Sequence, residues 1–477
     1  MPESIRCDLC IIGAGSGGLS VAAGASQMGS DVVLLERERM GGDCLNTGCV
    51  PSKALLAAGH VAQNARRAEA FGIRTGPVSA QWEQVRNHVH DVIGQIAPHD
   101  SVERFEGLGV RVIQEEGRFL SPTTVQAGSR QITARRFVIA TGSRPAMPTL
   151  DGLSRAAPLF TNENIFDNRE PIGHLIVIGG GPIGLELAQA HRRLGAQVTV
   201  LVRSKLLPKD DPEASEVVRN ALESEGVTIH VGLKFLRVER RGQQSVTVVV
   251  DRGDGKETSV EGTHLLVAAG RTPNIDALTL DDAGIEHNHR GITVTPGLRT
   301  SNHRVYAIGD VAGPYQFTHM AGYQAGIVIR SALFRLPAKV DYSAVPWVTY
   351  TDPELAHVGL SEQDARQAGH PVTVLKKPFT ENDRARAERA TDGFIKVILG
   401  KKGRILGATL VGIHAGELLQ PWTLAIQNRM KIGAMATAIA PYPTLSDINK
   451  GVAGSFYTPS LFSEKTRKLV RFLSRFG

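Results

Sequence analysis

Two cysteines, Cys44 and Cys49, stand five positions apart in a glycine-rich segment of residues 41–53. Two thiols that open and close a disulfide exchange two electrons, with a reduction potential set by their surroundings. A nucleotide-binding signature lies shortly before this segment, so we expect the dithiol to act as a relay beside a two-electron organic carrier. Such a relay needs elements that hold the nucleotide and the dithiol together.

The first nucleotide-binding signature follows a short apolar strand near the start of the chain. Its Gly-x-Gly-x-x-Gly spacing is formed by Gly13, Gly15 and Gly18, and a helix is predicted to begin there. The first glycine permits a tight turn, the second lets a pyrophosphate approach, and the third lets helix and strand meet. The phosphate then rests on the helix N-terminus. A second strand ends in Glu36, where a carboxylate accepts a hydrogen bond from a ribose hydroxyl.

The same spacing returns later in the chain, between two further predicted strands, at Gly179, Gly181 and Gly184. The position equivalent to Glu36 now holds Val202, and Arg203 follows it, with Lys209 close behind in the sequence. Valine cannot hold a ribose hydroxyl, whereas arginine pairs well with a 2′-phosphate. The pattern favours NADPH; the alternative is NADH, with Arg203 an ordinary surface residue. Two dinucleotide folds predict one tightly held flavin, FAD, and one exchanging nicotinamide.

The order of these motifs resembles that of the class I pyridine nucleotide–disulfide oxidoreductases, which include glutathione reductase, dihydrolipoyl dehydrogenase and mercuric reductase. Beyond the dithiol string, the resemblance rests on Ala140-Thr141-Gly142-Ser143, Ala269-Gly270-Arg271-Thr272-Pro273-Asn274, Ala307-Ile308-Gly309-Asp310 and Tyr350-Thr351-Asp352-Pro353-Glu354. It implies an α/β protein with two Rossmann-like dinucleotide-binding domains and a C-terminal α+β dimerisation domain, acting as a homodimer.

The resemblance also implies roles for individual residues. Cys49 would be the thiol near the flavin and would form the charge-transfer pair, and Cys44 would be the interchange thiol that attacks the substrate. Only a thiolate attacks, so we expect the pKa of Cys44 to be lowered by a helix start or a nearby charge. Lys53 would pair with Glu186 near the flavin ring, and Asp310 would bind the ribityl chain. Further cofactor contacts are implied for Thr141, Gly142 and Arg271.

The predicted domains follow from the positions of the motifs. An FAD-binding domain with the dithiol is expected at residues 1–150 and 276–345, an NAD(P)H-binding domain at 151–275, and a dimerisation domain at 346–464, followed by a tail at 465–477. Within the dimerisation domain we predict a strand at 393–398 and a helix from 415 to 430 that Pro421 kinks.

One motif departs from the family pattern. Where members that act on ordinary disulfides have His-Pro-Thr-x-x-Glu, this chain has Tyr442-Pro443-Thr444-Leu445-Ser446-Asp447. Tyrosine has an ordinary pKa of about 10, so it donates a hydrogen bond well but accepts a proton poorly near neutral pH. Mercuric reductase also has a tyrosine there, although its C-terminal cysteine pair and amino-terminal metal-binding domain are not expected here. The alternative is that Tyr442 packs in the dimer interface. For His319 we expect a structural or flavin-contacting role rather than that of a base.

The predicted tail is amphipathic. Leu469, Phe472, Leu473 and Phe476 recur at helical spacing, and arginines form an opposite stripe at positions 467, 471 and 475. Two interpretations remain open, a helix docked on the protein's own dimer and a helix attached to an anionic membrane or acidic partner.

The composition is that of an ordinary globular protein, with 477 residues, of which 42% are hydrophobic and 21% charged. No apolar run reaches the roughly 18 residues of a membrane span and the first residues do not resemble a signal peptide, so a cytoplasmic location is expected. The net charge of +7 is explained by basic residues around anionic cofactors, without nucleic-acid binding. No resident metal is predicted.

Only four cysteines are present, so the chain is not a disulfide scaffold. The other two, Cys7 and Cys10, lie in a predicted strand, where residues three apart point to opposite faces, and we expect buried, unreactive thiols.

The function predicted from these features is electron transfer from NAD(P)H through FAD and a Cys44–Cys49 disulfide to an acceptor. That acceptor is a small-molecule or protein disulfide, or a thiophilic metal ion. One alternative is a dihydrolipoyl dehydrogenase-like enzyme that serves a lipoylated carrier. Another is a redox-sensing flavoprotein with little turnover.

Overall fold

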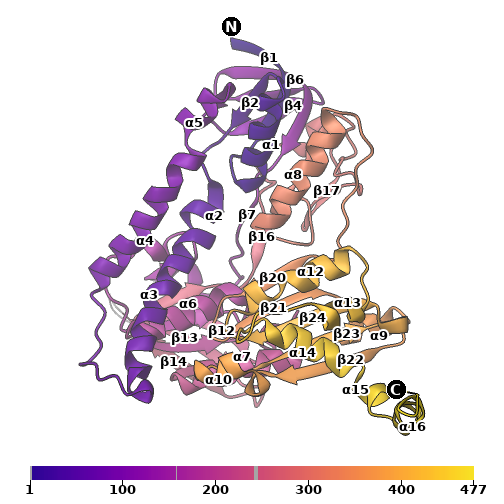
Figure 1. The fold of residues 1–477 in the computed structure, drawn as a ribbon. Coiled ribbons are helices and arrows are strands. Elements are labelled where there is room, and N and C mark those ends of the chain that lie inside the picture. The colour runs from indigo at the N-terminus through magenta and orange to yellow at the C-terminus, as the bar shows by residue number, and fades with distance from the viewer. Residues whose placement is uncertain (1–2, 157, 241–244, 477) are drawn as a thin grey trace. The chain divides into compact units, whose positions relative to one another are not determined.

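The computed structural model describes residues 3–156, 158–240 and 245–476. The chain divides into two compact units, which are described separately. The N-terminal unit comprises residues 1–205 and 226–340, and the C-terminal unit comprises residues 206–225 and 341–477 (Figure 1).

The first sheet of the N-terminal unit has the order β3-β2-β1-β6-β5-β4, with β19 beside β6. Its strands are β1 (Glu3–Ile12), β2 (Val32–Leu35), β3 (Val110–Ile113), β4 (Gly117–Ser121), β5 (Thr124–Ala127), β6 (Arg130–Ile139) and β19 (Val305–Ala307). The strands β3, β2, β1, β6 and β19 run parallel, whereas β4 pairs antiparallel with β5, and β5 pairs antiparallel with β6. All four residues of β2 are buried, as expected for a parallel strand covered on both faces.

The second sheet of this unit is parallel throughout and has the order β11-β10-β9-β15-β8. Its strands are β8 (Leu159–Phe160), β9 (His174–Ile178), β10 (Gln197–Leu201), β11 (Val227–His230) and β15 (His264–Val267). A separate antiparallel sheet contains β12 (Lys234–Arg240), β13 (Val246–Asp251) and β14 (Glu257–Gly262). The first sheet carries a glycine loop after β1 and the second carries one after β9, both central parallel strands, which is where ligands bind in open α/β sheets.

Helices connect the strands and position the candidate site. They include α1 (Ser16–Gln27), α2 (Gly42–Asn46), α3 (Cys49–Arg67), α4 (Trp82–Ile96), α5 (Val102–Gly107), α6 (Pro182–Arg193) and α8 (Thr318–Ala332). Helix α1 packs against α8, and α3 packs against α6. Gly17 permits the first contact, since a side chain there would lie 3.1 Å from Ile308 Cδ1 and 3.3 Å from Ala321 Cβ. The α/β class and the two dinucleotide-binding folds are thereby confirmed.

The C-terminal unit is built on an antiparallel sheet of order β20-β21-β24-β23-β22. Its strands are β20 (Pro346–Thr349), β21 (Glu354–Gly359), β22 (Thr373–Pro378), β23 (Phe394–Leu399) and β24 (Ile405–Gly412). The helices are α7 (Pro212–Ser224), α9 (Glu362–Gln367), α10 (Asp383–Ala387), α11 (Ala415–Leu418), α12 (Gln420–Gln427), α13 (Ile432–Thr437), α14 (Asp447–Ser455), α15 (Thr458–Leu461) and α16 (Glu464–Leu473).

Alternation along β23 separates the two faces of this sheet. Ile395 and Val397 join a core that contains Trp422 of α12, whereas Lys396 between them binds acidic residues at the start of α7. Thus α7, which lies between β10 and β11 in the sequence, packs on the sheet of the C-terminal unit.

The helix predicted from residue 415 to 430 is two helices, α11 and α12, separated at Leu419. Proline has no backbone N–H and its ring clashes with the carbonyl four residues before it. Pro421 therefore ends one helix and lies in the first turn of the next. Backbone N–H groups in the first turn have no acceptor within the helix, so the missing N–H of proline breaks no helical hydrogen bond there.

The expectation that Cys7 and Cys10 point to opposite faces is wrong, because both side chains belong to one buried cluster. The N–H groups of Asp8 and Leu9 both donate to Asp31 O, at 3.0 and 3.1 Å. Two successive donors on one acceptor form a bulge, which shifts the alternation of side chains by one residue. Burial raises the pKa of the Cys7 thiol to about 12 and also raises that of Cys10.

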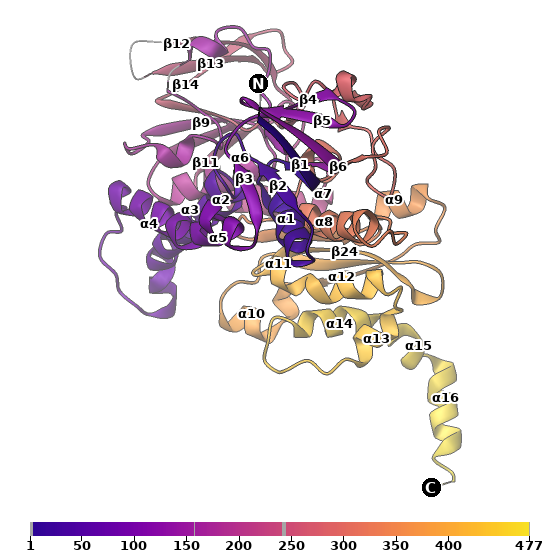
Figure 2. The same ribbon diagram turned by 90° about the horizontal axis from the view of Figure 1, so that it is seen from above.

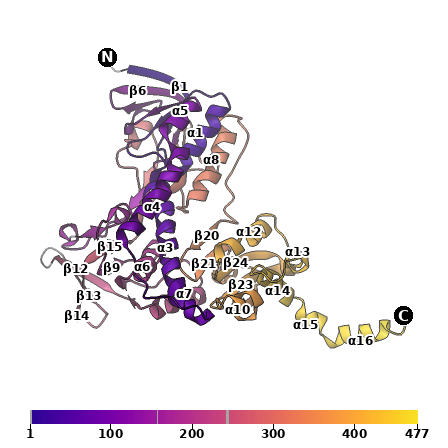
Figure 3. The ribbon, with the colours of Figure 1, turned by 60° about the vertical axis from the view of Figure 1, so that its left-hand side comes forward.

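The amphipathic helix predicted in the tail is present as α16, with Ser463 as its N-cap. Figures 2 and 3 show α15 and α16 extending beyond the other elements of the C-terminal unit. No helix among the described residues is long and apolar enough to cross a membrane.

Candidate active site

The dithiol segment lies directly against the first glycine loop. Gly41 N donates to Ala14 O at 3.0 Å, and a side chain at Gly42 would lie 2.8 Å from Gly15 Cα. Cys44 is in the short helix α2, and Cys49 is the first residue of α3. The packing of backbone on backbone explains why glycine is required at position 42, and it holds both thiols beside the nucleotide loop.

The surroundings of the two thiols shift their pKa values in opposite directions. A hydrogen bond from Cys44 is the largest cause that lowers the pKa of Cys49, to about 6, and Thr318 and the charge of Lys53 act in the same direction. Thr318 Oγ1 lies 3.3 Å from Cys49 Sγ. The start of a 19-residue helix is also a setting that favours a thiolate.

The expectation of a lowered pKa for Cys44 is wrong for the reduced pair. Its hydrogen bond to Cys49, followed by burial, raises the pKa of Cys44. Since one proton is shared between two neighbouring sulfurs, the sulfur at the helix start, with Lys53 nearby, keeps the negative charge and the other keeps the proton.

Lys53 lies one helical turn after Cys49 and forms an ion pair with Glu186. The distance from Lys53 Nζ to Glu186 Oε2 is 2.7 Å, and the Glu186 side chain is only 6% exposed. Glu186 belongs to α6, which begins directly after Gly181 of the second glycine loop. This pair therefore ties the dithiol helix to the helix of the second nucleotide fold.

The first glycine loop has the shape of a phosphate cradle. Gly13 has φ +103°, and a side chain there would lie 2.5 Å from Ala140 O. A side chain at Gly18 would lie 1.9 Å from Gly13 O, whereas at Gly15 the nearest atom, Gly42 Cα, is 4.0 Å away. Thus Gly13 and Gly18 are required by close packing, whereas Gly15 leaves the backbone at the start of α1 accessible to an anion. This arrangement fits the pyrophosphate of FAD.

Glu36 follows β2 and holds this loop in place. Its Oε2 accepts from Ala14 N at 2.7 Å, and its Oε1 accepts from Glu38 N at 2.8 Å. A carboxylate oxygen accepts more than one hydrogen bond, so capacity remains for a ribose hydroxyl.

The second glycine loop repeats the geometry. A side chain at Gly179 would lie 2.1 Å from Ala268 O and one at Gly184 would lie 2.5 Å from Gly179 O, whereas Gly181 has no atom within 4 Å of such a position. After β10, Val202 is buried and Arg203 is exposed, without a carboxylate partner among the described residues. Lys209 is exposed and belongs to the C-terminal unit.

A polar network joins three motifs that are far apart in the sequence. Arg271 donates to Ser143 Oγ at 2.7 Å and lies 3.0 Å from Asp43 Oδ2 and 3.6 Å from Asp310 Oδ2. Ser143 Oγ in turn donates to Asp310 at 2.6 Å. Burial raises the pKa of Asp310, although Ser143 and Arg271 oppose this effect.

Two of these residues were missed as functional candidates, although both lie in the quoted motifs. Asp43 directly precedes Cys44, and Ser143 directly follows Gly142. Their side chains give Arg271 a structural role between the dithiol segment and Asp310. Thr141 is placed beside them by mutual hydrogen bonds with Asn274, at 2.8 and 2.9 Å.

Tyr442 lies in the C-terminal unit and is 73% exposed, so it is not packed within its own chain. Its Oη donates to Asp383 Oδ2 at 3.0 Å, and this hydrogen bond is the main cause that raises the pKa of Tyr442. Asp447, at the start of α14, contributes to the same rise through its charge. Asp383 rather than Asp447 therefore accepts from the tyrosine, which stays protonated. His319 stacks on Phe317, with ring centroids 5.2 Å apart.

Comparison with known proteins identifies the family. The family model described as pyridine nucleotide-disulphide oxidoreductase matches residues 7–325, and the model for the dimerisation domain of that family matches residues 345–452. Mercuric reductase of Staphylococcus aureus is 35% identical over 94% of this chain and 82% of that protein. Dihydrolipoyl dehydrogenase of Bacillus subtilis is 34% identical over 94% of this chain and 96% of that protein.

Among solved structures, the Cu(II) complex of the HOCl-induced flavoprotein disulfide reductase RclA from Escherichia coli has a TM-score of 0.84. It is 25% identical, and the match covers 94% of this chain and 99% of that chain. Together with the dithiol, the two glycine loops and the matched dimerisation domain, these similarities show that the chain belongs to the pyridine nucleotide-disulphide oxidoreductase family.

Proposed function

We propose that this flavoprotein oxidoreductase passes electrons from NADPH to the Cys44–Cys49 disulfide, and that Cys44 delivers them to a disulfide or a thiophilic metal ion. The observation that carries the proposal is the position of the dithiol against the first glycine loop, with Cys44 in α2 and Cys49 at the start of α3. Members of the family use FAD and NAD(P)H, and the dimerisation domain indicates a homodimer.

The two thiols divide the reduction of a disulfide acceptor between them. The sulfur of Cys44 attacks one acceptor sulfur, so that a mixed disulfide forms and the first acceptor thiolate leaves and takes up the proton that Cys44 has lost. The Cys49 thiolate then attacks the Cys44 sulfur, which closes the Cys44–Cys49 bond and releases the second thiolate. The acceptor gains two electrons and the pair loses two. The lowered pKa of Cys49 keeps the resolving thiolate available near neutral pH.

The residues that would hold FAD are those of the first glycine loop with Glu36, and Asp310 with Arg271 and Ser143. When bound, FAD supplies two-electron transfer between the nicotinamide and the dithiol. Lys53 would remain next to this cofactor, held by Glu186, and its positive charge favours the Cys49 thiolate.

Specificity for NADPH is assigned to Arg203 and Val202 in this proposal. The equivalent of Glu36 is apolar and buried, so it cannot accept from a ribose hydroxyl, whereas the exposed guanidinium of Arg203 suits a phosphate.

Acting across the dimer, Tyr442 is proposed to turn its single O–H from Asp383 to the departing thiolate rather than to act as a base, since the hydrogen bond to Asp383 raises its pKa. A dihydrolipoyl dehydrogenase-like activity is the second candidate, because the relatives at similar identity include that enzyme. It predicts NAD-linked oxidation of a dithiol.

Anaerobic reduction of the purified protein with NADPH or NADH, followed by oxidised lipoamide, glutathione disulfide or Hg(II), tests this proposal. We expect faster reduction by NADPH, and we expect Arg203→Gln to raise KM for NADPH by about tenfold while NADH is unaffected. Arg290→Gln, an exposed arginine elsewhere in the unit, is the matched control. Reoxidation by none of the three acceptors would contradict the proposed activity and would favour a sensor.

A further inference from the structure

Helix α16 exposes apolar side chains along one side. Leu469, Phe472 and Leu473 recur at helical spacing and are 55%, 54% and 56% exposed. Phe476 is also exposed, and its ring centroid lies 5.1 Å from that of Phe472, so the apolar side continues beyond the last helical turn. Contiguous apolar side chains on a surface mark an interaction site.

The opposite side of the helix is basic. Arg467, Arg471 and Arg475 recur every four residues, with Lys468 beside them, whereas the sequence of α16 contains one acidic residue, Glu464. None of these basic side chains has a carboxylate partner among the described residues, so their charges remain available to an anionic surface.

The position of α16 leaves all of its sides open within the C-terminal unit. None of its residues is buried, and the helix extends beyond the sheet and the helices that cover it (Figures 2 and 3). Its ten residues span about 15 Å, which is half the thickness of a hydrocarbon core. A helix of this length lies along a lipid surface rather than across it.

We propose that α16 binds the surface of an anionic lipid membrane, with its apolar side at the boundary between headgroups and acyl chains and its arginines among the lipid phosphates. Charge complementarity favours an anionic membrane over a second copy of the chain as the binding partner of α16. A second copy also carries a net charge of +7, whereas an anionic bilayer offers charges complementary to the arginine row.

Flotation of the full-length, FAD-loaded enzyme tests the proposal. The vesicles consist of phosphatidylcholine, with or without about 30% phosphatidylglycerol. We expect the protein to float with the anionic vesicles and to partition about tenfold more weakly onto the neutral ones. The variants Leu469→Glu/Phe472→Glu and Arg467→Gln/Arg471→Gln/Arg475→Gln should each lower partitioning by about tenfold or more.

Two matched controls remove similar groups elsewhere. Phe71→Glu/Ile73→Glu replaces two exposed apolar residues, and Lys234→Gln/Lys256→Gln replaces two exposed cations; both should float like the unmodified protein. Equal flotation with both vesicle types, no flotation at all, or flotation unchanged by the α16 variants would overturn the proposal. Sedimentation equilibrium identifies the rival occupant, because loss of self-association in the α16 variants, without vesicle binding, assigns the helix to a second copy.

Discussion

Lys53 on α3 donates to Glu186 on α6 across 2.7 Å and joins the helix that begins at Cys49 to the helix that follows the second glycine loop. The carboxylate of Glu186 is almost fully buried, whereas the lysine is partly exposed. The pair therefore has a structural effect, through the contact of two helices, and an electrostatic effect on the nearby thiolate.

Removal of the lysine alone should destabilise the protein. We expect Lys53→Met to lower the free energy of unfolding by about 1–3 kcal/mol, since it deprives a buried carboxylate of its cation. The double variant Lys53→Met/Glu186→Leu should recover part of this loss. Urea unfolding of both single variants and the double variant gives the coupling energy. A coupling near zero would show that the ion pair does not tie α3 to α6.

The hydrogen bond from Cys44 should control the acidity of Cys49. In the reduced protein the pKa of Cys49, about 6, lies below that of an ordinary thiol, so the thiolate is present above pH 6 and is lost as the pH falls through this value. Cys44→Ala removes the donor and should move the pKa of Cys49 upward, whereas Cys44→Ser retains a hydroxyl donor and should move it less. The pH dependence of Cys49 alkylation measures both shifts. A Cys49 pKa that stays at about 6 in both variants would assign the effect to Lys53 and the helix start instead.

Replacement of Tyr442 by histidine should restore an acid–base group. Histidine titrates near neutral pH, and a positioned group of this kind contributes about 10²-fold or more to proton transfer. We expect Tyr442→His to raise kcat/KM for glutathione disulfide or lipoamide, with a new ionisation near pH 6.5, and Tyr442→Phe, the control, to show neither effect. A Tyr442→His variant with the pH profile of the unmodified protein would place Tyr442 outside the proton path.

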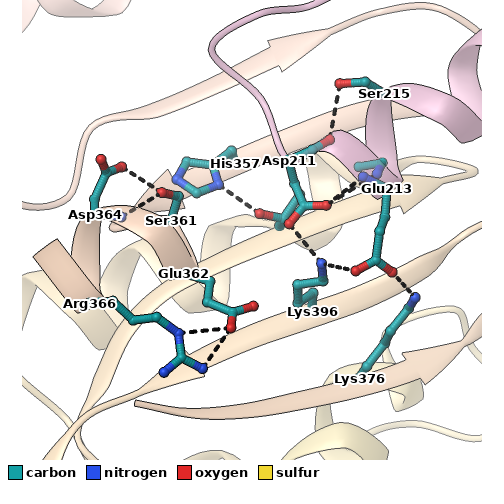
Figure 4. A network of polar contacts seen from close by, with 12 residues as sticks. Asp211, Glu213, Ser215, His357, Ser361, Glu362, Asp364, Arg366, Lys376 and Lys396 are labelled. Atoms are coloured by element: carbon teal, nitrogen blue, oxygen red, sulfur yellow. Dashed lines mark hydrogen bonds and ion pairs between the residues drawn. The ribbon is translucent and has the colours of Figure 1, made fainter. Parts of the chain in front are cut away.

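In the C-terminal unit, Lys396 anchors the start of α7 to β23 (Figure 4). Its Nζ lies 2.8 Å from Asp211 Oδ2 and 2.6 Å from Glu213 Oε1, and Asp211 also caps α7 by accepting from Glu213 N. Burial alone would lower the pKa of Lys396, but these two carboxylates outweigh it and raise the pKa. Lys376 pairs with Glu213 as well.

Lys396→Met should therefore destabilise the C-terminal unit, by about 2–3 kcal/mol near neutral pH. Lys376 and Lys396 lower the pKa of Glu213 from 4.5 to about 2. Because the folded pKa is the lower one, the stabilisation is fully present above pH 4.5 and is lost as the pH falls through about 2. The effect of the substitution should shrink as acid is added, as measured by urea unfolding at neutral and acidic pH. Lys401→Met, an exposed lysine just after the same strand, is the control, and a loss independent of pH would point to packing alone.

The sequence was most informative where backbone geometry requires one residue type. Only glycine fits at positions 13 and 179, because a neighbouring carbonyl oxygen lies too close to leave room for a side chain. The glycine spacing that begins at each position therefore predicted a nucleotide fold. Helix α16 was also predicted, since its periodicity needs no tertiary contact. Local patterns of this kind depend on near neighbours alone.

Contacts across long stretches of sequence were not predicted. Thr318 lies 269 residues from Cys49, and Asp383 lies 59 residues from Tyr442. The pKa of Cys44 depends on such contacts and on the direction of one S–H bond, so the expectation that it is lowered was wrong. The bulge at Asp8 depends on a carbonyl of the loop before β2, which alternation along β1 does not reveal.

The central claim, that electrons leave through Cys44, is tested most directly by the turnover of Cys44→Ser with NADPH and the best of the three acceptors. We predict that this variant still consumes NADPH with a one-electron dye, since the nucleotide sites are intact, but loses turnover with the disulfide or metal acceptor by about 10³-fold or more. Turnover with that acceptor equal to the unmodified enzyme would contradict the account.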